Sequence, residues 1–241
     1  MPNTLLIDGD IVLYQYSSTV EHEVDWGDDV WSLWSDAKEA KQLILQYLEN
    51  LQEMTGTEDL VFCFSDKDNF RKSIYPEYKA SRKGKRKPIC YKPLKEWIQE
   101  EYPSEQWSGL EADDVLGILA TSDKYGKEAI IVSEDKDLMT IPCFLWRSGE
   151  LLTISKKEAD YNHLYQTLVG DSTDGYGGLK GVGAKRATEI LKIPTWDSVI
   201  TAYIKAGYTE EEALTQARLA RILRSSDWDD VNKKPILWSA K

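Results

Sequence analysis

The stretch TLLID, residues 4–8, is a short run of apolar, strand-forming residues that ends on an acid, Asp8. Two later stretches have the same form: LVFCFSD (60–66) ends on Asp66, and AIIVSED (129–135) ends on Asp135. Such runs are typical of a parallel α/β sheet whose ligands gather at the carboxyl ends of its strands. The sequence therefore predicts an α/β fold with acids along one edge of its sheet.

Nine acids occupy positions where a strand is expected to end or a helix to begin, and they form five clusters. They are Asp8; Asp66; Glu111, Asp113 and Asp114; Asp135 and Asp137; and Asp171 and Asp174. Converging carboxylates repel each other, and bound cations relieve that repulsion. Oxygen-only ligand sets favour Mg²⁺ or Mn²⁺ over softer metals that need His or Cys. The sequence therefore predicts a magnesium site that serves chemistry on phosphate.

Two of these clusters also have a purely structural explanation. In LEADDVLG (110–117), acids at a helix start favour the helix dipole and cap free N–H groups. In SEDKDL (133–138), Asp135 can cap a short helix. However, an acid occupies the same position after each of three separate apolar runs. Helix capping does not require that agreement, which therefore favours the metal site.

Composition limits the class of protein. With 241 residues, the chain can bury one substantial core with a smaller lobe attached. Cys63, Cys90 and Cys143 lack CxxC spacing, which argues against a disulfide framework and fits a reducing cytoplasm. Only His22 and His163 are available for His-rich metal sites or nucleophilic triads. Since no stretch approaches the ~20 apolar residues of a membrane span, we expect a soluble, unprocessed cytoplasmic protein.

The net charge of −11 is distributed unevenly along the chain. EHEVDWGDD (21–29) is strongly acidic, whereas KASRKGKRK (79–87) carries six basic residues in nine. Tyr75, Tyr78 and Tyr91 are interleaved with the cations of the wider basic segment 71–95, and cations beside aromatic faces are typical of channels for single-stranded nucleic acid. A solvated surface loop is the alternative. The local charge therefore favours a nucleic-acid partner despite the acidic total.

Hydrophobic periodicity predicts alternating strands and helices followed by a mostly helical region. The predicted strands are 4–8, 60–65, 129–133 and 144–147, and the predicted helices are 36–54, 94–101, 111–125 and 209–225. An acidic loop is expected after the first strand, a turn at 102–109, and a final strand or a clamp through Trp238 in the tail. Trp26, Trp31 and Trp34 are interpreted as packing residues. The predicted domains are a core, 1–155, and a helical lobe, 156–241.

The stretch GDSTDGYGGLKGVGAKRATEIL (170–191) combines glycines, acids and bases before an expected helix. Gly181 and Gly183 allow close approach of backbone N–H groups to a phosphate, and Lys185 and Arg186 add positive charge. Contacts of this kind hold a duplex backbone without reading its sequence. A plain glycine-rich turn is the alternative to this helix-hairpin-helix interpretation.

Taken together, these motifs resemble the flap endonuclease and 5′ nuclease superfamily, and most closely the 5′-3′ exonucleases of T7-like bacteriophages. The motifs that carry the resemblance follow in chain order. They are IDGD (7–10), FSDKDNFRKSIYPEYKASRK (64–83), LEADDVLG (110–117), SEDKDL (133–138), GDSTDGYGGLKGVG (170–183) and ARILR (220–224).

The resemblance implies a PIN-like α/β nuclease core, a helical arch built from the basic segment 67–95, and a helix-three-turn-helix lobe whose hairpin, 170–192, holds duplex DNA. The nine acids would be the ligands of two Mg²⁺ ions, with Mn²⁺ able to substitute, and the hairpin would also hold K⁺. Lys79 and Arg82 match cations that approach the scissile phosphate, Tyr78 matches a base-stacking tyrosine, and Arg86 is assigned to DNA contact.

The implied activity is hydrolysis of duplex DNA, and of RNA/DNA primers, from 5′ ends during phage replication, recombination or host DNA degradation, with phage replication proteins as partners. A flap endonuclease and a non-catalytic DNA-binding module are the rival functions. A PIN-type ribonuclease is a third rival, although it would need neither the GVGAKR hairpin nor the long basic segment.

Overall fold

A computed structural model gives the fold, and it describes residues 4–125 and 129–240. The centre is a six-stranded sheet with the order β5-β4-β1-β6-β7-β8. The strands are β1 (Leu5–Asp8), β4 (Leu60–Phe64), β5 (Ser104–Gln106), β6 (Ile130–Val132), β7 (Phe144–Arg147) and β8 (Glu150–Thr153). All neighbouring pairs are parallel except β7 and β8, which are antiparallel. The predicted α/β fold with a central parallel sheet is confirmed.

Strand register brings the acids that follow β1, β4 and β6 to one edge of the sheet. Asp8 lies opposite Cys63 of β4, and Ile7 lies opposite Val132 of β6. The chain therefore leaves all three strands on the same side, at their carboxyl ends. Because side chains alternate along a strand, the Leu5 and Ile7 side chains enter one hydrophobic cluster and that of Leu6 enters the other.

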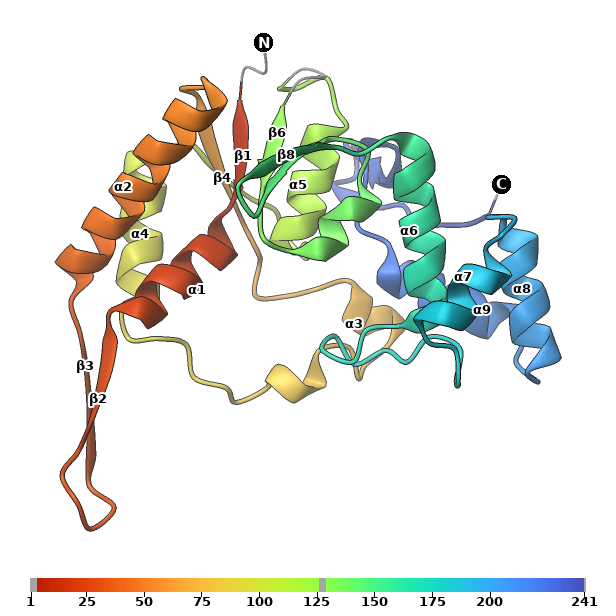
Figure 1. The fold of residues 1–241 in the computed structure, drawn as a ribbon, viewed down its shortest axis with the longest axis horizontal. Helices are drawn as coiled ribbons and strands as arrows, with labels where there is room; N and C mark the ends of the chain where they lie inside the picture. Colours follow the sequence, from red (N-terminus) through yellow and green to blue (C-terminus); the bar gives the residue numbers. More distant parts are fainter. Residues whose placement is uncertain (1–3, 126–128, 241) are drawn as a thin grey trace.

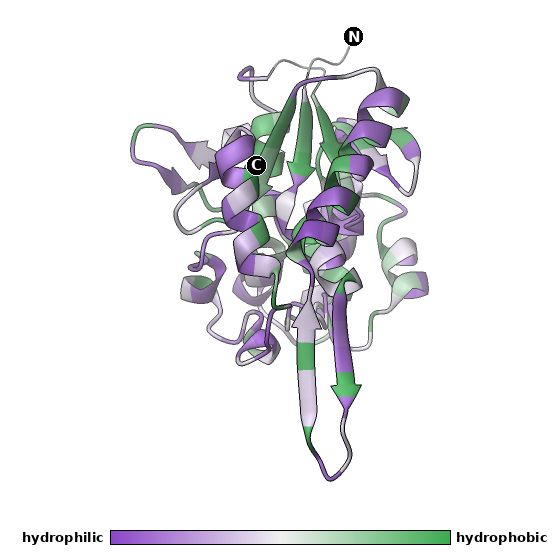
Figure 2. Ribbon diagram, turned by 90° about the vertical axis from the view of Figure 1, so that its left-hand side faces the viewer, coloured by the Kyte–Doolittle hydropathy of each residue, from purple (hydrophilic) through white to green (hydrophobic). Residues whose placement is uncertain are grey.

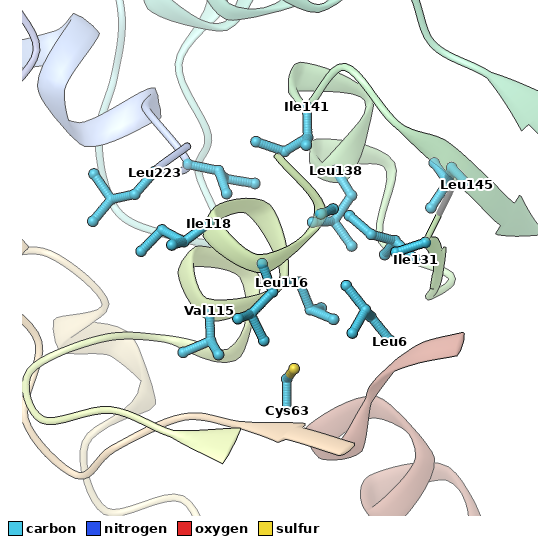
Figure 3. Packing of buried hydrophobic residues seen from close by; sticks show 14 of the residues in the cluster. Leu6, Cys63, Val115, Leu116, Ile118, Ile131, Leu138, Ile141, Leu145 and Leu223 are labelled. Carbon is cyan, nitrogen blue, oxygen red and sulfur yellow. The ribbon is translucent and has the colours of Figure 1, made fainter. Parts of the chain in front are cut away.

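Helices cover both faces of the sheet (Figure 1). One face packs against α1 (Gly9–Thr19), α2 (Ala37–Thr55) and α4 (Tyr91–Glu101). The other packs against α5 (Ala112–Ala120), whose Val115 and Leu116 lie near Leu6 and Cys63 of the sheet, while Leu223 of the C-terminal segment lies farther along the helix (Figure 3). The sheet is therefore buried on both faces, as its continuous apolar strands require.

The acidic loop expected after the first strand is instead a helix followed by a hairpin. Asp8 caps α1 by accepting from the backbone N of Ile11 (3.2 Å). A Cβ atom at Gly9 would lie 2.2 Å from the Phe64 ring, so only glycine lets the helix start this close to β4. Residues 21–35 then form the hairpin of β2 (Glu21–Asp25) and β3 (Trp31–Ser35). Tertiary packing of Val12 and Leu13 decides a helix that local periodicity does not reveal.

The remaining elements agree with the predictions apart from their ends. The capping box of Thr209 and Glu212 is present at the start of α9 (Glu210–Ala220), which stops short of the predicted end. It stops because the following residues turn toward α5, where the Leu223 backbone N donates to Asp114 Oδ1 (3.1 Å). Helix α5 likewise ends at Ala120, and strand β5 replaces part of the turn expected at 102–109.

A third hydrophobic cluster lies among the C-terminal helices α6 (Lys156–Val169), α7 (Ala184–Ile190), α8 (Trp196–Lys205) and α9. After α9 the chain returns to the sheet cluster, where Trp228 is buried, and it forms the short pair β9 (Trp228–Asp229) and β10 (Lys234–Pro235). Trp238 contacts the rings of His163 and Trp196, each at 5.0 Å between centroids. The tail therefore adds strands and also packs through Trp238. Residues 1 and 241, the outer limits of the predicted domains, lie outside the described residues.

The basic segment forms a strap, residues 67–90, that runs from the lobe side of the sheet to the start of α4 (Figure 1). It contains only two short helical pieces within this range, α3 (Arg71–Ile74) and η1 (Ala80–Arg82). The rest consists of turns and irregular chain, which differs from the helical arch that the resemblance implies. Seven of its residues from Ser81 to Lys87 are exposed, since consecutive cations repel each other and favour hydration. No helix within 4–125 and 129–240 is both long and apolar enough to cross a membrane.

A buried ion pair fixes the strap to the core. Arg71, 2 % exposed, donates from both terminal nitrogens to Asp114, which is 0 % exposed, at 2.7 Å each. The Arg71 Nε also donates to the Leu219 carbonyl (3.1 Å). A single guanidinium therefore joins the strap, α5 and the end of α9, and each of its partners depends on it for charge or hydrogen bonding.

Replacing Arg71 should be among the most destabilising single changes in the strap. We expect Arg71→Met to lower the free energy of unfolding by about 3–5 kcal/mol, because it leaves the buried Asp114 carboxylate without its cationic partner. Urea unfolding measures this, with the neighbouring exposed Lys72→Met as the matched control. The double variant Arg71→Met/Asp114→Leu should recover part of the loss, since no unpaired charge remains. Equal stability of Arg71→Met and Lys72→Met would contradict the assignment.

Candidate active site

An open cavity of about 410 Å³ lies at the carboxyl edge of the sheet, between the strap and the lobe. It is lined by acids from the end of β1, the first turn of α1, the start of α5, the turn after β6, and the loop after α6. Those acids include Asp8, Asp10, Glu111, Asp113, Asp135, Asp137, Asp171 and Asp174. Seven of the nine acids predicted from the sequence therefore meet in one cavity.

Hydrogen bonds fix the acids that follow the strands. Asp8, 2 % exposed, accepts from the Ser133 hydroxyl (2.8 Å), which joins the ends of β1 and β6. Asp135 accepts from the Asp137 backbone N (2.8 Å) and caps η2 (Lys136–Thr140). The capping alternative for Asp135 is thus real, but it uses one carboxylate oxygen of a residue that still lines the cavity.

The acids raise each other's pKa values. Burial, with a contribution from the Asp10 charge, raises the pKa of Asp8 to about 7. Burial together with the charges of Asp8 and Asp135 raises the pKa of Asp113 well above its usual range. Burial and the Asp135 charge raise the pKa of Asp137 to about 6. These shifts mean that the full set of carboxylates is costly to keep ionised without positive charge among them.

The strap supplies two cations to the cavity. Lys79 forms an ion pair with Glu111 and lies 3.5 Å from Asp174, and Arg82 donates to Asp174 (2.8 Å). Burial alone would lower the pKa of Lys79, but the Glu111 and Asp174 charges raise it. Burial alone would raise the pKa of Glu111, but Lys79 and Arg71 lower it to about 2. Both predicted cations therefore face the acids.

The backbone at Lys79 is held in a left-handed conformation. Its φ is 55°, and its backbone N donates to the Asp174 carbonyl (2.7 Å). A left-handed conformation is unusual for lysine and persists where surrounding contacts determine it. The loop after α6 therefore fixes the direction in which the Lys79 side chain leaves the strap.

Tyr78 lies in a different environment from the one that base stacking requires. It is 3 % exposed, its ring stacks on Tyr176 at 6.5 Å, and its hydroxyl lies within hydrogen-bonding distance of both Glu111 (2.9 Å) and Asp174 (3.0 Å), which share its single hydrogen. The ring thus packs inside the protein in this conformation, and the hydroxyl orients two of the cavity's carboxylates.

Glycines allow the loop that carries Asp171 and Asp174 to fold tightly. Gly170 has φ 72°, and a Cβ there would lie 2.4 Å from the Gly178 backbone N. Asp171 forms an isolated β-bridge with Tyr176 across this loop, and its carboxylate lies 3.6 Å from Lys136. The close backbone crossing thereby places both loop acids in the cavity.

Three of the residues predicted from the sequence lie outside the cavity. Asp66 accepts from the Gly109 backbone N (2.8 Å) and lines a neighbouring pocket under the strap. Asp114 is committed to Arg71, as described above. Arg86 pairs with Glu21 of the β2–β3 hairpin (2.6 Å). The motif LEADDVLG predicted a cluster of acids here. It could not show that Asp114 faces the interior whereas Glu111 and Asp113 face the cavity.

The predicted hairpin residues also lie apart from the cavity. Gly181 has φ 79°, and Gly183 caps α7 without a side-chain bond. Lys185 and Arg186, in the first turn of α7, are exposed. The positions thus present backbone and positive charge to solvent on the lobe.

Charged residues that the sequence did not predict also line the cavity, among them Asp10 and Lys136. Asp10 accepts from the Tyr91 hydroxyl (2.7 Å) and the Ser65 backbone N (3.0 Å), so it joins α1 to α4 and β4. The second acid of the IDGD motif was its signal. Lys136 lines the cavity too and lies 3.2 Å from Asp137, although its flanking acids alone drew attention in the sequence.

The donor set of the cavity fits divalent metal ions. Its potential ligands are carboxylates, which divalent ions such as Mg²⁺ bind. Burial together with mutual repulsion raises the pKa values of several of these carboxylates, and a bound cation would stabilise their ionised form. Among residues 4–125 and 129–240, no three acid, histidine or cysteine side chains are arranged to hold one ion directly. In that part of the chain Glu111, Asp174 and Asp171 are paired with Lys79, Arg82 and Lys136. Metal binding would therefore require some of these ion pairs to separate.

The fold and the cavity together define an α/β nuclease with a PIN-like sheet. Residues 3–160 match the family model described as 5′-3′ exonuclease, N-terminal resolvase-like domain. The chain is 33 % identical to the exodeoxyribonuclease of Enterobacteria phage T3 over 98 % of this chain and 93 % of that protein. It is 32 % identical to the exonuclease of Escherichia phage T7 over 97 % and 92 %.

The protein belongs to the 5′-3′ exonuclease family. Its fold is also similar to that of a bacteriophage T5 flap endonuclease in complex with DNA and metal ions, with a TM-score of 0.68 at 16 % identity, covering 90 % of this chain and 88 % of that one. The flap endonuclease Xni of Shewanella oneidensis is 30 % identical over 65 % of this chain and 66 % of its own. The resemblance inferred from the motifs is confirmed at the level of the family.

Removing one carboxylate from the cavity should stabilise the protein without metal. In EDTA, we expect Asp113→Asn to raise the free energy of unfolding by about 1 kcal/mol, because one of several repelling acids becomes neutral. Addition of Mn²⁺ should stabilise the parent protein more than the variant, which has lost a ligand. Thermal unfolding with and without Mn²⁺ measures both effects, and the exposed Asp123→Asn is the matched control. An Asp113→Asn protein that is less stable than the control in EDTA would contradict mutual repulsion.

Proposed function

We propose that the protein is a Mg²⁺-dependent 5′-3′ exodeoxyribonuclease that hydrolyses phosphodiester bonds of duplex DNA from 5′ ends. The observation that carries the proposal is the acid-lined cavity closed on one side by a cationic strap, in a chain of the 5′-3′ exonuclease family. Acids suit divalent ions, and cations on the strap suit a phosphate. Both are needed in one place for phosphodiester hydrolysis.

Metal ligands are proposed from the cavity acids alone. Asp8, Asp113, Asp135, Asp137 and Asp171 are the proposed ligands, joined by Glu111 and Asp174 once these leave their ion pairs. Bound Mg²⁺, or Mn²⁺ in its place, would supply an activated water and stabilise the departing 3′ oxygen. Asp66 and Asp114 are left out of this set, since each is held by other groups outside the cavity.

The chain's own residues would orient the phosphate and the ligands. The Ser133 hydroxyl and the Ile11 backbone N hold the Asp8 carboxylate in place, which fixes one ligand before substrate arrives. A DNA phosphate can replace Glu111 and Asp174 as the partner of Lys79 and Arg82. Lys79 is fixed by its backbone bond to the loop after α6, so its charge would meet the negative charge of the transition state.

DNA is proposed to span both parts of the molecule. The strap would take the 5′ strand, and Gly181, Gly183, Lys185 and Arg186 would hold the duplex backbone, with K⁺ bound at the hairpin. Exposed backbone and cations in the first turn of α7 support this contact. The corresponding division is a nuclease core of 1–155 and a DNA-holding lobe of 156–241, although the chain after α9 packs back on the core.

A phage context is proposed from the sources of the similar proteins. In that context the enzyme would act in the host cytoplasm on replication or recombination intermediates and on host DNA, together with phage replication proteins. RNA/DNA hybrids at primers are a further proposed substrate, since contacts to the backbone do not depend on base sequence.

A structure-specific flap endonuclease is the second candidate function. The similarity of the fold to the bacteriophage T5 flap endonuclease and of the sequence to the flap endonuclease Xni supports it. The two activities share the cavity and differ in where the 5′ strand is cut, so they are distinguished by product length.

The polarity of digestion tests the proposal. We expect a duplex labelled at its 5′ end to release short labelled products in Mg²⁺, whereas a 3′-labelled duplex shortens progressively, because the cavity receives the 5′ end. EDTA and the Asp135→Ala substitution should each abolish the release of 5′-labelled products and the shortening of the 3′-labelled strand, since each removes metal binding. Gel electrophoresis of blunt and 5′-flap duplexes measures this. Cutting confined to the flap junction would favour the endonuclease, and binding without cleavage would contradict nuclease function.

Lys79 should affect the chemical step more than DNA binding. We expect Lys79→Ala to slow single-turnover cleavage by about 10²–10³-fold, because a cation near the developing negative charge is lost. Lys83→Ala, an exposed cation of the same strap, is the matched control and should change the rate by no more than about twofold. If Lys79→Ala weakened DNA binding and left the cleavage rate unchanged, Lys79 would contact the DNA backbone without acting in the chemical step.

A further inference from the structure

The β2–β3 hairpin projects from the molecule without covering its core. Figure 1 and Figure 2 show it extending away from the ends of α1 and α2, far from the sheet. In the described part of the chain, none of the hydrophobic clusters includes a residue of 21–35. The prediction that Trp26, Trp31 and Trp34 are packing residues is therefore wrong, since these side chains are 52–68 % exposed.

The strand register gives the hairpin two chemically different faces. Glu21 lies opposite Ser35, Glu23 opposite Leu33, and Asp25 opposite Trp31, so one face carries all three acids of β2 together with Leu33 and Trp31 of β3. His22 lies opposite Trp34 and Val24 opposite Ser32, which places these residues on the other face.

Contacts between side chains of the face that carries His22 and Trp34 fix its aromatic rings while leaving them exposed. The rings of His22 and Trp34 lie 4.7 Å apart, and the Trp26 indole N–H donates to the Ser32 hydroxyl (2.8 Å). The Trp26 polar atom is thus satisfied while its ring stays exposed. Exposed apolar groups gathered on one projecting element mark an interaction surface in a soluble protein.

The hairpin's charge selects the kind of partner. Residues 21–35 contain five acids and neither lysine nor arginine. Phosphates of nucleic acid and a second copy of the same hairpin would both be repelled by this charge. A partner that presents cations beside apolar side chains would match both faces.

The hairpin also has free edges. Its sheet contains only β2 and β3 among the described residues, so each strand has one side without a strand neighbour. Along the outer edge of β2, acids alternate with His22, Val24 and Trp26. An extended segment that adds to this edge would meet acids on one face and apolar groups on the other.

We propose that the β2–β3 hairpin is a docking site for a partner protein segment that binds along β2 in extended form and alternates cationic with apolar side chains. The base of the hairpin is fixed for this purpose. Glu21 accepts from Arg86 (2.6 Å) and from the Ile89 backbone N (2.7 Å), and the Cys90 thiol donates to the Ser35 hydroxyl (2.9 Å). The outer residues remain available, and docking occurs beside the strap.

Binding of two synthetic peptides tests the proposal with the full chain. The probes are a short labelled peptide of alternating Lys and Val and a matched peptide of alternating Glu and Val, followed by fluorescence anisotropy. We expect the Lys–Val peptide to bind and the Glu–Val peptide not to bind. Trp26→Ser/Trp34→Ser and, separately, Glu23→Gln/Asp25→Asn should each weaken binding by about tenfold or more.

Matched controls carry the same chemical changes on other exposed surfaces. Ile193→Ser/Ile204→Ser removes exposed apolar groups, and Glu53→Gln/Glu58→Gln removes exposed acids. Both should bind the Lys–Val peptide within about twofold of the parent. The proposal would be overturned if Glu53→Gln/Glu58→Gln weakened binding as much as the hairpin variants, or if Trp26→Ser/Trp34→Ser bound the peptide fully. Either result would mean that the Lys–Val peptide is attracted only by the protein's net negative charge.

Two further outcomes would also overturn it. A concentration-dependent dimer in sedimentation, lost in Trp26→Ser/Trp34→Ser, would make the hairpin a contact between copies. Weaker binding of DNA by the same variant would make it a nucleic-acid surface. Because none of these hairpin residues lines the acid cavity, nuclease activity on a short duplex should stay unchanged, so failure of the docking site is distinguishable from failure of the nuclease assignment.

Discussion

Mutual repulsion among carboxylates at one edge of the sheet is the constraint on which the rest of this structure depends. Parallel strands bring Asp8 and the Asp135 turn together, and α5 adds Asp113 to the same place. The raised pKa values of Asp8 and Asp113 reflect the free energy that this arrangement costs the folded protein. The proposed metals would convert that cost into binding affinity, which is the usual relation between stability and function at an active site.

The cations of the strap respond to the same constraint in two ways. Arg71 is committed to Asp114 in the interior, where it holds the strap, α5 and the chain after α9 together. Lys79 and Arg82 are paired with Glu111 and Asp174 at the surface of the cavity, where the proposed function would have a phosphate or a metal replace either partner. The strap therefore contains one deeply buried ion pair with a structural role, Arg71–Asp114, and two ion pairs at the cavity surface whose partners the proposed function would exchange.

Sequence alone located the sheet, the edge at which the acids meet, and seven of the nine assigned acids, because apolar runs and strand ends are local signals. It could not assign Asp114 to Arg71, since that pairing depends on how α5 turns relative to the strap. It missed α1, whose start requires the contact of Gly9 with Phe64, and it interpreted the exposed hairpin tryptophans as packing residues. Those errors share a cause: each depends on tertiary contacts that have no periodic trace in the chain.

Anomalous diffraction from crystals grown with Mn²⁺ tests the central claim most directly, since it locates the metal independently of turnover. We expect Mn²⁺ peaks inside the cavity, within coordination distance of carboxylates that include Asp8, Asp113 and Asp135, and the loss of at least one peak in Asp113→Asn crystals. Mn²⁺-dependent cleavage in solution together with no Mn²⁺ peak among these acids would contradict the account, because the catalytic metal would then lie elsewhere.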